Sequence, residues 1–129
     1  MAVTWQRAQP NTDGDDRPVD LPSDAVPHLT YDRSPDILLL TFFGPDRPHV
    51  VRYVSDRCGL LIDPVDGSVV GVEIDDVLAV ATAVDSTLLA AVAAAEYTGM
   101  TNADRALLPT ALPFAAAVQA VLDAVNNAE

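Results

Sequence analysis

The stretch that decides the fold is residues 37–43, which read Ile-Leu-Leu-Leu-Thr-Phe-Phe. Successive side chains of a β-strand point to opposite faces. One face carries Leu38, Leu40 and Phe42, and the other carries Ile37, Leu39 and Phe43. A strand that is wetted on one side would alternate apolar with polar residues. This strand is apolar on both sides, so both faces of the sheet around it need cover.

Short apolar runs separated by turn residues predict further strands around this one. We place strands near residues 28–32, 36–43, 49–55, 59–63 and 68–74. The intervening turns cover residues 44–48, 56–59 and 64–67, and Gly67 suits the left-handed position of a hairpin loop. Connections this short predict antiparallel pairing, because a parallel crossover needs a dozen or more residues.

After Ile74 the pattern changes to that of helices. Asp75 and Asp76 suit an N-cap and first turn. The apolar residues that follow recur at helical spacing: Leu78, Ala81, Val84, Leu88, Val92 and Ala95. The polar triplet at 85–87 leaves open whether residues 76–98 form one helix or two, and Gly99 fits a helix stop.

The last part of the chain predicts a short turn and a terminal helix. Thr101 with Asp104 resembles a capping box, and the helix begins after Thr110 with Pro113 in its first turn. Its apolar stripe is formed by Phe114, Val118, Val121, Leu122 and Val125. Such a stripe is more often core than partner surface, although a terminal amphipathic helix is also a common dimerisation element.

These elements predict a single α+β domain in a chain of 129 residues. A small antiparallel sheet of about five strands occupies residues 28–74, and two to three α-helices from residues 75–129 pack on one face of it. Residues 1–27 are rich in proline and aspartate and are expected to form an extended or disordered arm. Trp5 in this arm is either part of a solvated leader or an anchor on a partner.

Charge and composition exclude several classes of function. The net charge is −12, and residues 1–36, 37–76 and 77–129 contribute −4 each, so nucleic-acid binding is excluded for want of a basic patch. The longest apolar stretch, Val77 to Ala95, contains Asp85, which costs roughly 2.5–3.5 kcal/mol in mid-bilayer and disfavours a membrane span. One cysteine and no signal peptide predict a cytoplasmic protein without disulfides.

Residues 28–79 resemble the small bacterial and archaeal domain-of-unknown-function family numbered 2283. The resemblance begins at Tyr31-Asp32 and Asp36, which precede the apolar strand. It ends at Asp66-Gly67 followed by residues 69–74, Val-Val-Gly-Val-Glu-Ile. The arm and the helical tail lie outside it, and it implies no catalytic residue. The aspartates and Gly71 also have structural roles to play, as turn acceptors and as a point of close backbone approach.

No complete catalytic, cofactor or metal site is evident. Acid spacing at 63–67 does not suit a calcium loop, and one cysteine with His28 and His49 cannot close a structural zinc site. Cys58 and His49 lie at neighbouring strand ends, which permits a thiol nucleophile, but a free structural cysteine is the stronger interpretation. Glu73 and Asp75 share a face next to Asp76, and this acidic cluster could bind a cation or act as an acid/base pair.

The sequence therefore predicts a non-enzymatic interaction or assembly module, a homo-oligomer or an accessory subunit of a larger complex. Its partner is another protein or a second copy, and the contact residues are expected to be Trp5, Leu38, Leu40, Phe42, Phe114, Val118, Val121, Leu122 and Val125. The alternative is a small-molecule or cation binder, or a minor enzyme, that uses the Glu73–Asp76 cluster or Cys58. Membrane attachment through residues 77–95 is a third, weaker hypothesis.

Overall fold

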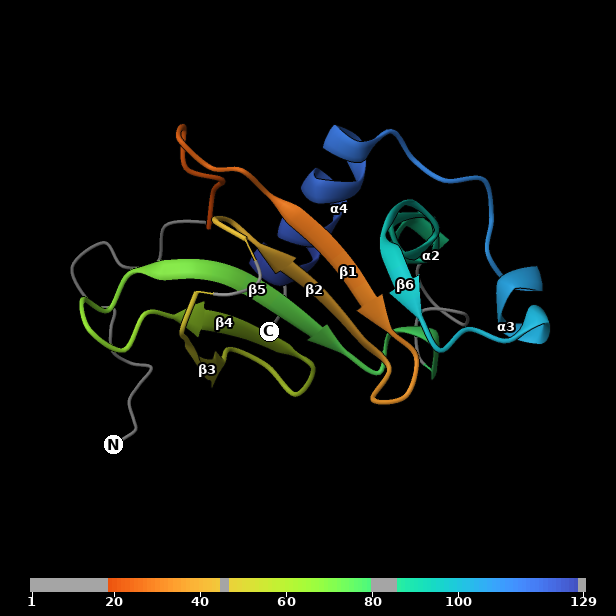
Figure 1. Ribbon diagram of the computed structural model, residues 1–129, viewed down its shortest axis with the longest axis horizontal. Coiled ribbons are helices and arrows are strands. Elements are labelled where there is room, and N and C mark those ends of the chain that lie inside the picture. The colour runs from red at the N-terminus through yellow and green to blue at the C-terminus, as the bar shows by residue number, and fades with distance from the viewer. Residues whose placement is uncertain (1–18, 45–46, 80–85, 128–129) are drawn as a thin grey trace.

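A computed structural model describes residues 19–44, 47–79 and 86–127 (Figure 1). It has an α+β arrangement with a mixed six-stranded sheet. The strands are β1 (His28–Asp32), β2 (Ile37–Thr41), β3 (Val50–Tyr53), β4 (Cys58–Ile62), β5 (Val69–Asp75) and β6 (Glu96–Thr98). The labelled helices are α2 (Ser86–Ala94), α3 (Asn102–Ala106) and α4 (Phe114–Asn126), and residues 77–79 are also helical. The predicted α+β class is confirmed.

The strand order is β3-β4-β5-β2-β1-β6, and it differs from a simple meander. The short turns correctly predict the antiparallel pairs β1–β2, β3–β4 and β4–β5. The turn at 44–48, however, does not join neighbouring strands, because β4 and β5 lie between β2 and β3. The central position suits β2, since a strand that is apolar on both faces is best placed with a neighbour on either side.

The sixth strand lies in the half of the chain that was expected to be wholly helical. β6 pairs with β1 in parallel, with Tyr31 opposite Tyr97, so the sheet is not purely antiparallel. The helix ends at Ala94, and Gly99, with φ +76°, follows β6 rather than the helix. The helix stop predicted at Gly99 is therefore wrong. The connection from β1 to β6 is long enough for a parallel crossover.

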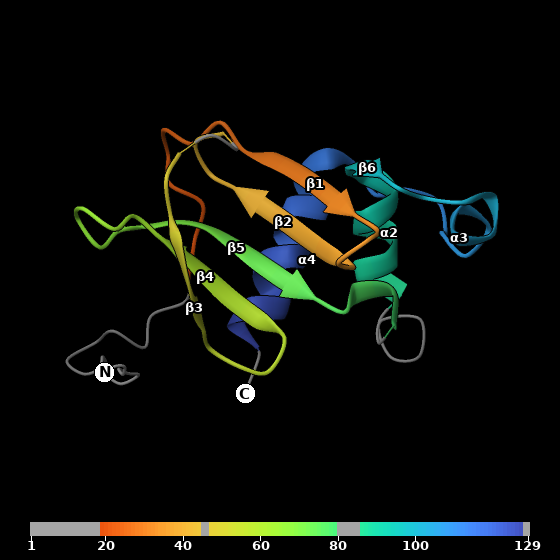
Figure 2. The ribbon, with the colours of Figure 1, turned by 60° about the horizontal axis from the view of Figure 1, so that its bottom comes forward.

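Helices α2 and α4 pack against each other and cover one face of the sheet, while none of the described helices lies on the opposite face (Figure 2). Leu38, Leu40 and Phe42 of the covered face are fully buried within the single chain. They lie in one core with residues of α4, which are Ala117, Val118, Val121, Leu122 and Val125. The terminal stripe is thus core, apart from Phe114, which is 47% exposed.

The turn between β1 and β2 connects the sheet to the segment after β5. Asp36 adopts a left-handed backbone (φ 60°) and is buried. Its carboxylate accepts hydrogen bonds from the backbone N–H groups of Leu78 (2.8 Å) and Ala79 (3.1 Å) and from the Tyr31 hydroxyl. The cap predicted at Asp75 and Asp76 is therefore supplied by Asp36, forty residues earlier in the chain. Asp32 also has its expected turn role, accepting from the Ser34 N–H.

Part of the predicted arm is fixed to the domain. The Val19 N–H donates to the Asn126 side chain (2.7 Å), and that side chain donates back to the Val19 carbonyl (3.0 Å). The Val26 N–H donates to the Phe42 carbonyl (2.8 Å). Residues 19–27 contain no helix or strand, as expected of an extended segment, but these bonds hold them to the domain. Trp5 lies outside the described residues.

Two local motifs were correctly predicted. Thr101 and Asp104 form a reciprocal capping box at the start of α3. Pro113, which was expected in the first turn of the terminal helix, is instead the N-cap residue before Phe114, so α4 begins later than predicted. Gly67 has φ +78° in the loop between β4 and β5. None of the described helices has the length and apolar character required to cross a bilayer.

Candidate functional site

Most of the described side chains that were predicted to dock a partner are buried in the core. Leu38, Leu40 and Phe42 face α2 and α4 in the core, so the predicted docking role for these residues is wrong. Val118, Val121, Leu122 and Val125 are buried by the same packing. The strand has two apolar faces, and the helices cover the one that carries Leu38. The opposite face carries Ile37 and Leu39, which are half-buried.

The exposed apolar residues gather instead on the edge strand β3. Val50, Val51 and Tyr53 are 54%, 39% and 51% exposed, respectively. β3 is the last strand of the sheet on its side, so among the described residues only β4 pairs with it. An edge strand of this kind presents unpaired backbone groups that can pair with another chain. The sequence predicts a strand near residues 49–55, and only the strand order shows that it lies at the edge of the sheet.

One hydrogen bond shows which residues of β3 point their backbone N–H and C=O groups towards β4. The Val54 N–H donates to the Cys58 carbonyl at 2.8 Å, so the backbone groups of residue 54 point towards β4. In an antiparallel pair the backbone groups of alternate residues point to the same side. Those of Val50 and Arg52 therefore also point towards β4, whereas those of Val51 and Tyr53 point outward.

A cluster of three polar side chains ties β3 to the sheet interior. Tyr53 crosses Gly59 of β4, and its hydroxyl oxygen lies 2.9 Å from Glu73 Oε2 and 2.6 Å from Asp75 Oδ2 of β5. Gly59 is needed for this crossing, since a Cβ there would lie 2.7 Å from Val51 Cγ1 and 3.4 Å from Tyr53 Cδ1. Strand alternation correctly predicted that Glu73 and Asp75 share a face.

Electrostatics in this Tyr53 cluster favours the protonated forms of two groups. Burial, and then the hydrogen bond with Asp75, raise the pKa of Glu73 above its ordinary value. The hydrogen bond to Asp75, followed by burial and by Glu73, raises the pKa of Tyr53. Asp76, the third acid of the predicted cluster, is exposed in a left-handed turn after β5.

The predicted cation and thiol sites find little support. In the part of the chain that the structure describes, no group of three histidine, cysteine or acidic residues could hold a metal ion. Cys58 is buried on the helix-covered face, and this burial raises the pKa of its thiol. His49 precedes β3 at the end where Val50 pairs with Ile62, while Cys58 begins β4 beyond the Tyr53–Gly59 pair. The two lie at opposite ends of the hairpin, so the predicted proximity is wrong.

We expect Cys58 to resist modification in the folded protein. Thiol chemistry requires an accessible thiolate, and both burial and the raised pKa oppose its formation. A chromogenic disulfide reagent at pH 8 should label the native protein far more slowly than the protein unfolded in guanidinium. Equal labelling rates in the two states would show that the thiol is accessible.

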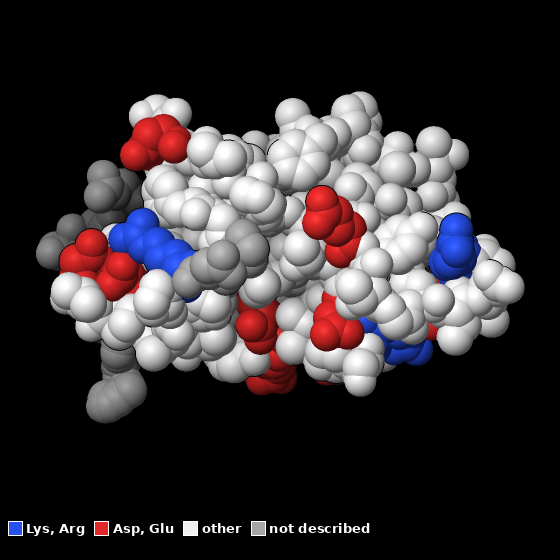
Figure 3. All heavy atoms as spheres, in the orientation of Figure 1, with Lys and Arg blue, Asp and Glu red and all other residues white. Residues whose placement is uncertain are grey.

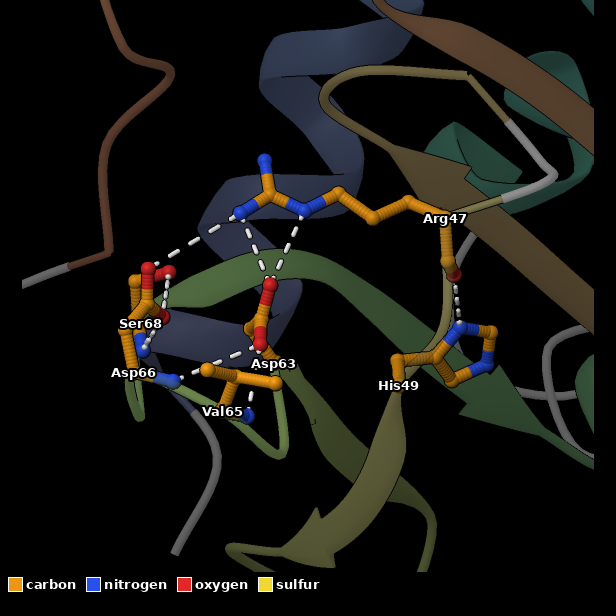
Figure 4. Close-up of polar contacts among 6 residues, drawn as sticks. All are labelled: Arg47, His49, Asp63, Val65, Asp66 and Ser68. Atoms are coloured by element: carbon orange, nitrogen blue, oxygen red, sulfur yellow. Dashed lines mark hydrogen bonds and ion pairs between the residues drawn. The ribbon is translucent and has the colours of Figure 1, made fainter.

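The loop at the far end of β4 is held by an arginine from the segment before β3 (Figure 4). Arg47 donates to Asp63 Oδ2 from Nε (3.1 Å) and Nη2 (2.8 Å), and its guanidinium lies 5.2 Å from the Phe43 ring centre. The Asp63 carboxylate also accepts the Val65 N–H, and these bonds lower its pKa. The acids of this loop are thus committed to internal bonds rather than to a calcium ion.

Charged side chains are dispersed over the surface. On the face shown in Figure 3 the blue areas are small and separate, with no continuous positive area. Two of the arginines lie beside acids, in the Arg33–Asp104 and Arg47–Asp63 ion pairs.

Comparison with known proteins finds no matching family model, no similar curated protein and no similar solved structure. The resemblance of residues 28–79 to the family numbered 2283 stays a prediction.

Proposed function

We propose that this chain is a non-enzymatic interaction module, a homo-oligomer or an accessory subunit of a larger complex, that docks through β3. The observation that supports it is the run of exposed Val50, Val51 and Tyr53 on an edge strand. Addition of a strand to such an edge combines backbone hydrogen bonds with apolar contacts to alternate side chains. The docking surface is thus a different part of the sheet from the one that the sequence indicates.

The first test asks whether the protein associates with itself or with another protein. Light scattering over a range of concentrations reports self-association, and capture from native lysate reports a different partner. We expect an assembly larger than one chain in at least one of the two measurements. A protein that stays monomeric and captures nothing would remove the basis of this proposal.

The sharper test is Val51→Pro. Proline at position 51 removes an outward N–H but leaves the N–H groups of Arg52 and Val54 in the β3–β4 pairing. We expect the association to be lost, with a change in the free energy of unfolding of no more than about 1 kcal/mol, because edge strands accept proline. Association of Val51→Pro at the wild-type level would contradict docking through β3.

A matched pair of substitutions separates docking from general surface hydrophobicity. Val50→Ser and Val26→Ser each remove an exposed valine, one on β3 and one outside it. We expect only Val50→Ser to weaken the association. Equal weakening by both would indicate non-specific hydrophobic association.

The alternative functions have less support. A cation binder or minor enzyme at Glu73–Asp76 would need Asp76 to join the cluster, and Asp76 lies in the exposed turn instead. A nucleophilic role for Cys58 would need exposure of the thiol, which is buried. Residues 80–85 of the stretch considered for membrane attachment lie outside the described residues.

A further inference from the structure

The Tyr53 hydroxyl has close contacts with two carboxyl groups but only one hydrogen to donate. A tyrosine hydroxyl has one hydrogen, yet its oxygen lies within hydrogen-bonding distance of two carboxyl groups. If both carboxyls are ionised, one hydrogen must be shared between two anions. Both contacts become full hydrogen bonds only when one carboxyl group carries a proton and donates it to the Tyr53 oxygen.

The two contact lengths favour Asp75 as the acceptor of the tyrosine hydrogen. The Asp75 contact is the shorter, at 2.6 Å, which is typical of a hydroxyl donating to a carboxylate. Tyr53 therefore donates to Asp75. With that hydrogen on Asp75, the 2.9 Å contact becomes a full hydrogen bond only if Glu73, the more deeply buried of the two acids, carries a proton.

We infer that Glu73, Tyr53 and Asp75 form a proton-dependent latch that holds the edge strand β3 against the sheet. With Glu73 protonated, the chain Glu73–Tyr53–Asp75 joins β3 to β5 across β4. When Glu73 loses its proton to solvent, the single tyrosine hydrogen faces two carboxylates. One of them is then left without a donor, which is unfavourable for the buried Glu73 carboxylate, so the closed position of Tyr53 is disfavoured.

The titratable groups around Glu73 do not compensate for the loss of its proton. On its own strand Glu73 meets Asp75, and from β3 it meets Tyr53. A hydrogen bond from Tyr53, and then His49 from the segment before β3, lower the pKa of Glu73, but burial and Asp75 outweigh them and the pKa is raised. The strand neighbours of Glu73 are Leu39 of β2 and Gly59 of β4, which carry no charge.

The sign of the pH dependence follows from linkage. The pKa of Glu73 is higher in the folded than in the unfolded protein. Below the unfolded pKa both states hold the proton, and the stabilisation is complete. As pH rises through the interval between the two values, the unfolded state releases its proton first, so stability falls until the folded pKa is passed. The latch is closed on the acidic side and opens with rising pH.

The experiment is hydrogen exchange and carboxyl titration by NMR on the full chain. The Val54 amide, which bonds the Cys58 carbonyl, reports closure of β3, and the Val72 amide in β5 reports the sheet centre. We expect Glu73 to titrate above its ordinary range. Across that transition, protection of Val54 relative to Val72 should fall about ten- to hundredfold, as expected for loss of one charge-assisted hydrogen bond.

Two variants and a control complete the design. Glu73→Gln supplies a permanent donor to Tyr53, so the Val54 amide should stay protected from hydrogen exchange at all pH values. Tyr53→Phe keeps the ring over Gly59 but removes the hydroxyl, so protection should be low throughout. Glu96→Gln makes the same acid-to-amide change on β6, at the other end of the sheet, and should behave as the wild type.

The outcomes distinguish the latch from the docking proposal. A Glu73 pKa at or below its ordinary value, or Val54 protection that does not follow Glu73, would overturn the latch, whether or not a partner binds. The consequence that pH regulates docking rests on the proposed function. If the latch responds to pH and no association is found, only the docking proposal fails.

Discussion

Replacing Asp36 by alanine is expected to lower the free energy of unfolding by about 3–5 kcal/mol, because three donors lose a buried acceptor at once. The Tyr31 hydroxyl is buried inside the core, and the Leu78 and Ala79 N–H groups begin a helical turn after β5. Against a typical domain stability of about 5–15 kcal/mol, this loss removes a large share of the total. Urea unfolding at pH 7 measures it.

Two further substitutions at Asp36 separate its side chain from its backbone. Asparagine keeps one acceptor oxygen and tolerates the left-handed conformation, so we expect it to lose less stability than alanine. Glycine removes the side chain but relieves the φ of 60°, so it should be more stable than alanine by about 1 kcal/mol. An alanine variant as stable as the wild type would mean that water replaces the carboxylate at this turn.

The second large effect is expected at Gly71. A Cβ at this position would lie 2.5 Å from the Leu40 carbonyl oxygen and 2.9 Å from Leu61 Cδ1. The first contact is with the backbone of a central strand, which cannot move without opening the β2–β5 pairing. Gly71→Ala should therefore cost about 3 kcal/mol, at the upper end for overpacking.

Gly67→Ala is the matched control, because it makes the same change where a Cβ would meet nothing within 4 Å. Its cost should be limited to the left-handed backbone, about 1 kcal/mol. Thermal unfolding of the two variants side by side measures the difference. Equal melting temperatures would show that the sheet adjusts around Gly71, and that close approach of the strands is not the reason for glycine there.

Gly71 is a position where the sequence pattern correctly indicates a feature of the tertiary structure. A glycine within an apolar strand indicates close backbone approach, and the structure identifies the approaching atom as the Leu40 carbonyl oxygen. The pairing of Glu73 with Asp75 was likewise predictable from alternation alone. The third member of that cluster, Tyr53, was not predictable, because its contact with β5 depends on the order of strands β3, β4 and β5.

The docking surface shows the same limit. A strand with two apolar faces indicates that both need cover, but it does not say which face the helices take. The terminal helix has a clear apolar stripe, and its packing on the Leu38 face places the predicted contact residues in the core. The exposed valines of β3 give no local signal, since an edge strand and an inner strand can have the same residues.

By itself, the sequence determined where most strands and the terminal helix lie, the capping box at Thr101 and the left-handed turn at Gly67. These features depend on side-chain periodicity and backbone preferences within a few residues. Tertiary structure alone decided the strand order, the parallel strand β6, the use of Asp36 as a cap and the burial of Leu38, Leu40 and Phe42. Those depend on contacts between segments far apart in the chain, where several arrangements bury similar apolar area and only packing of the whole domain selects one.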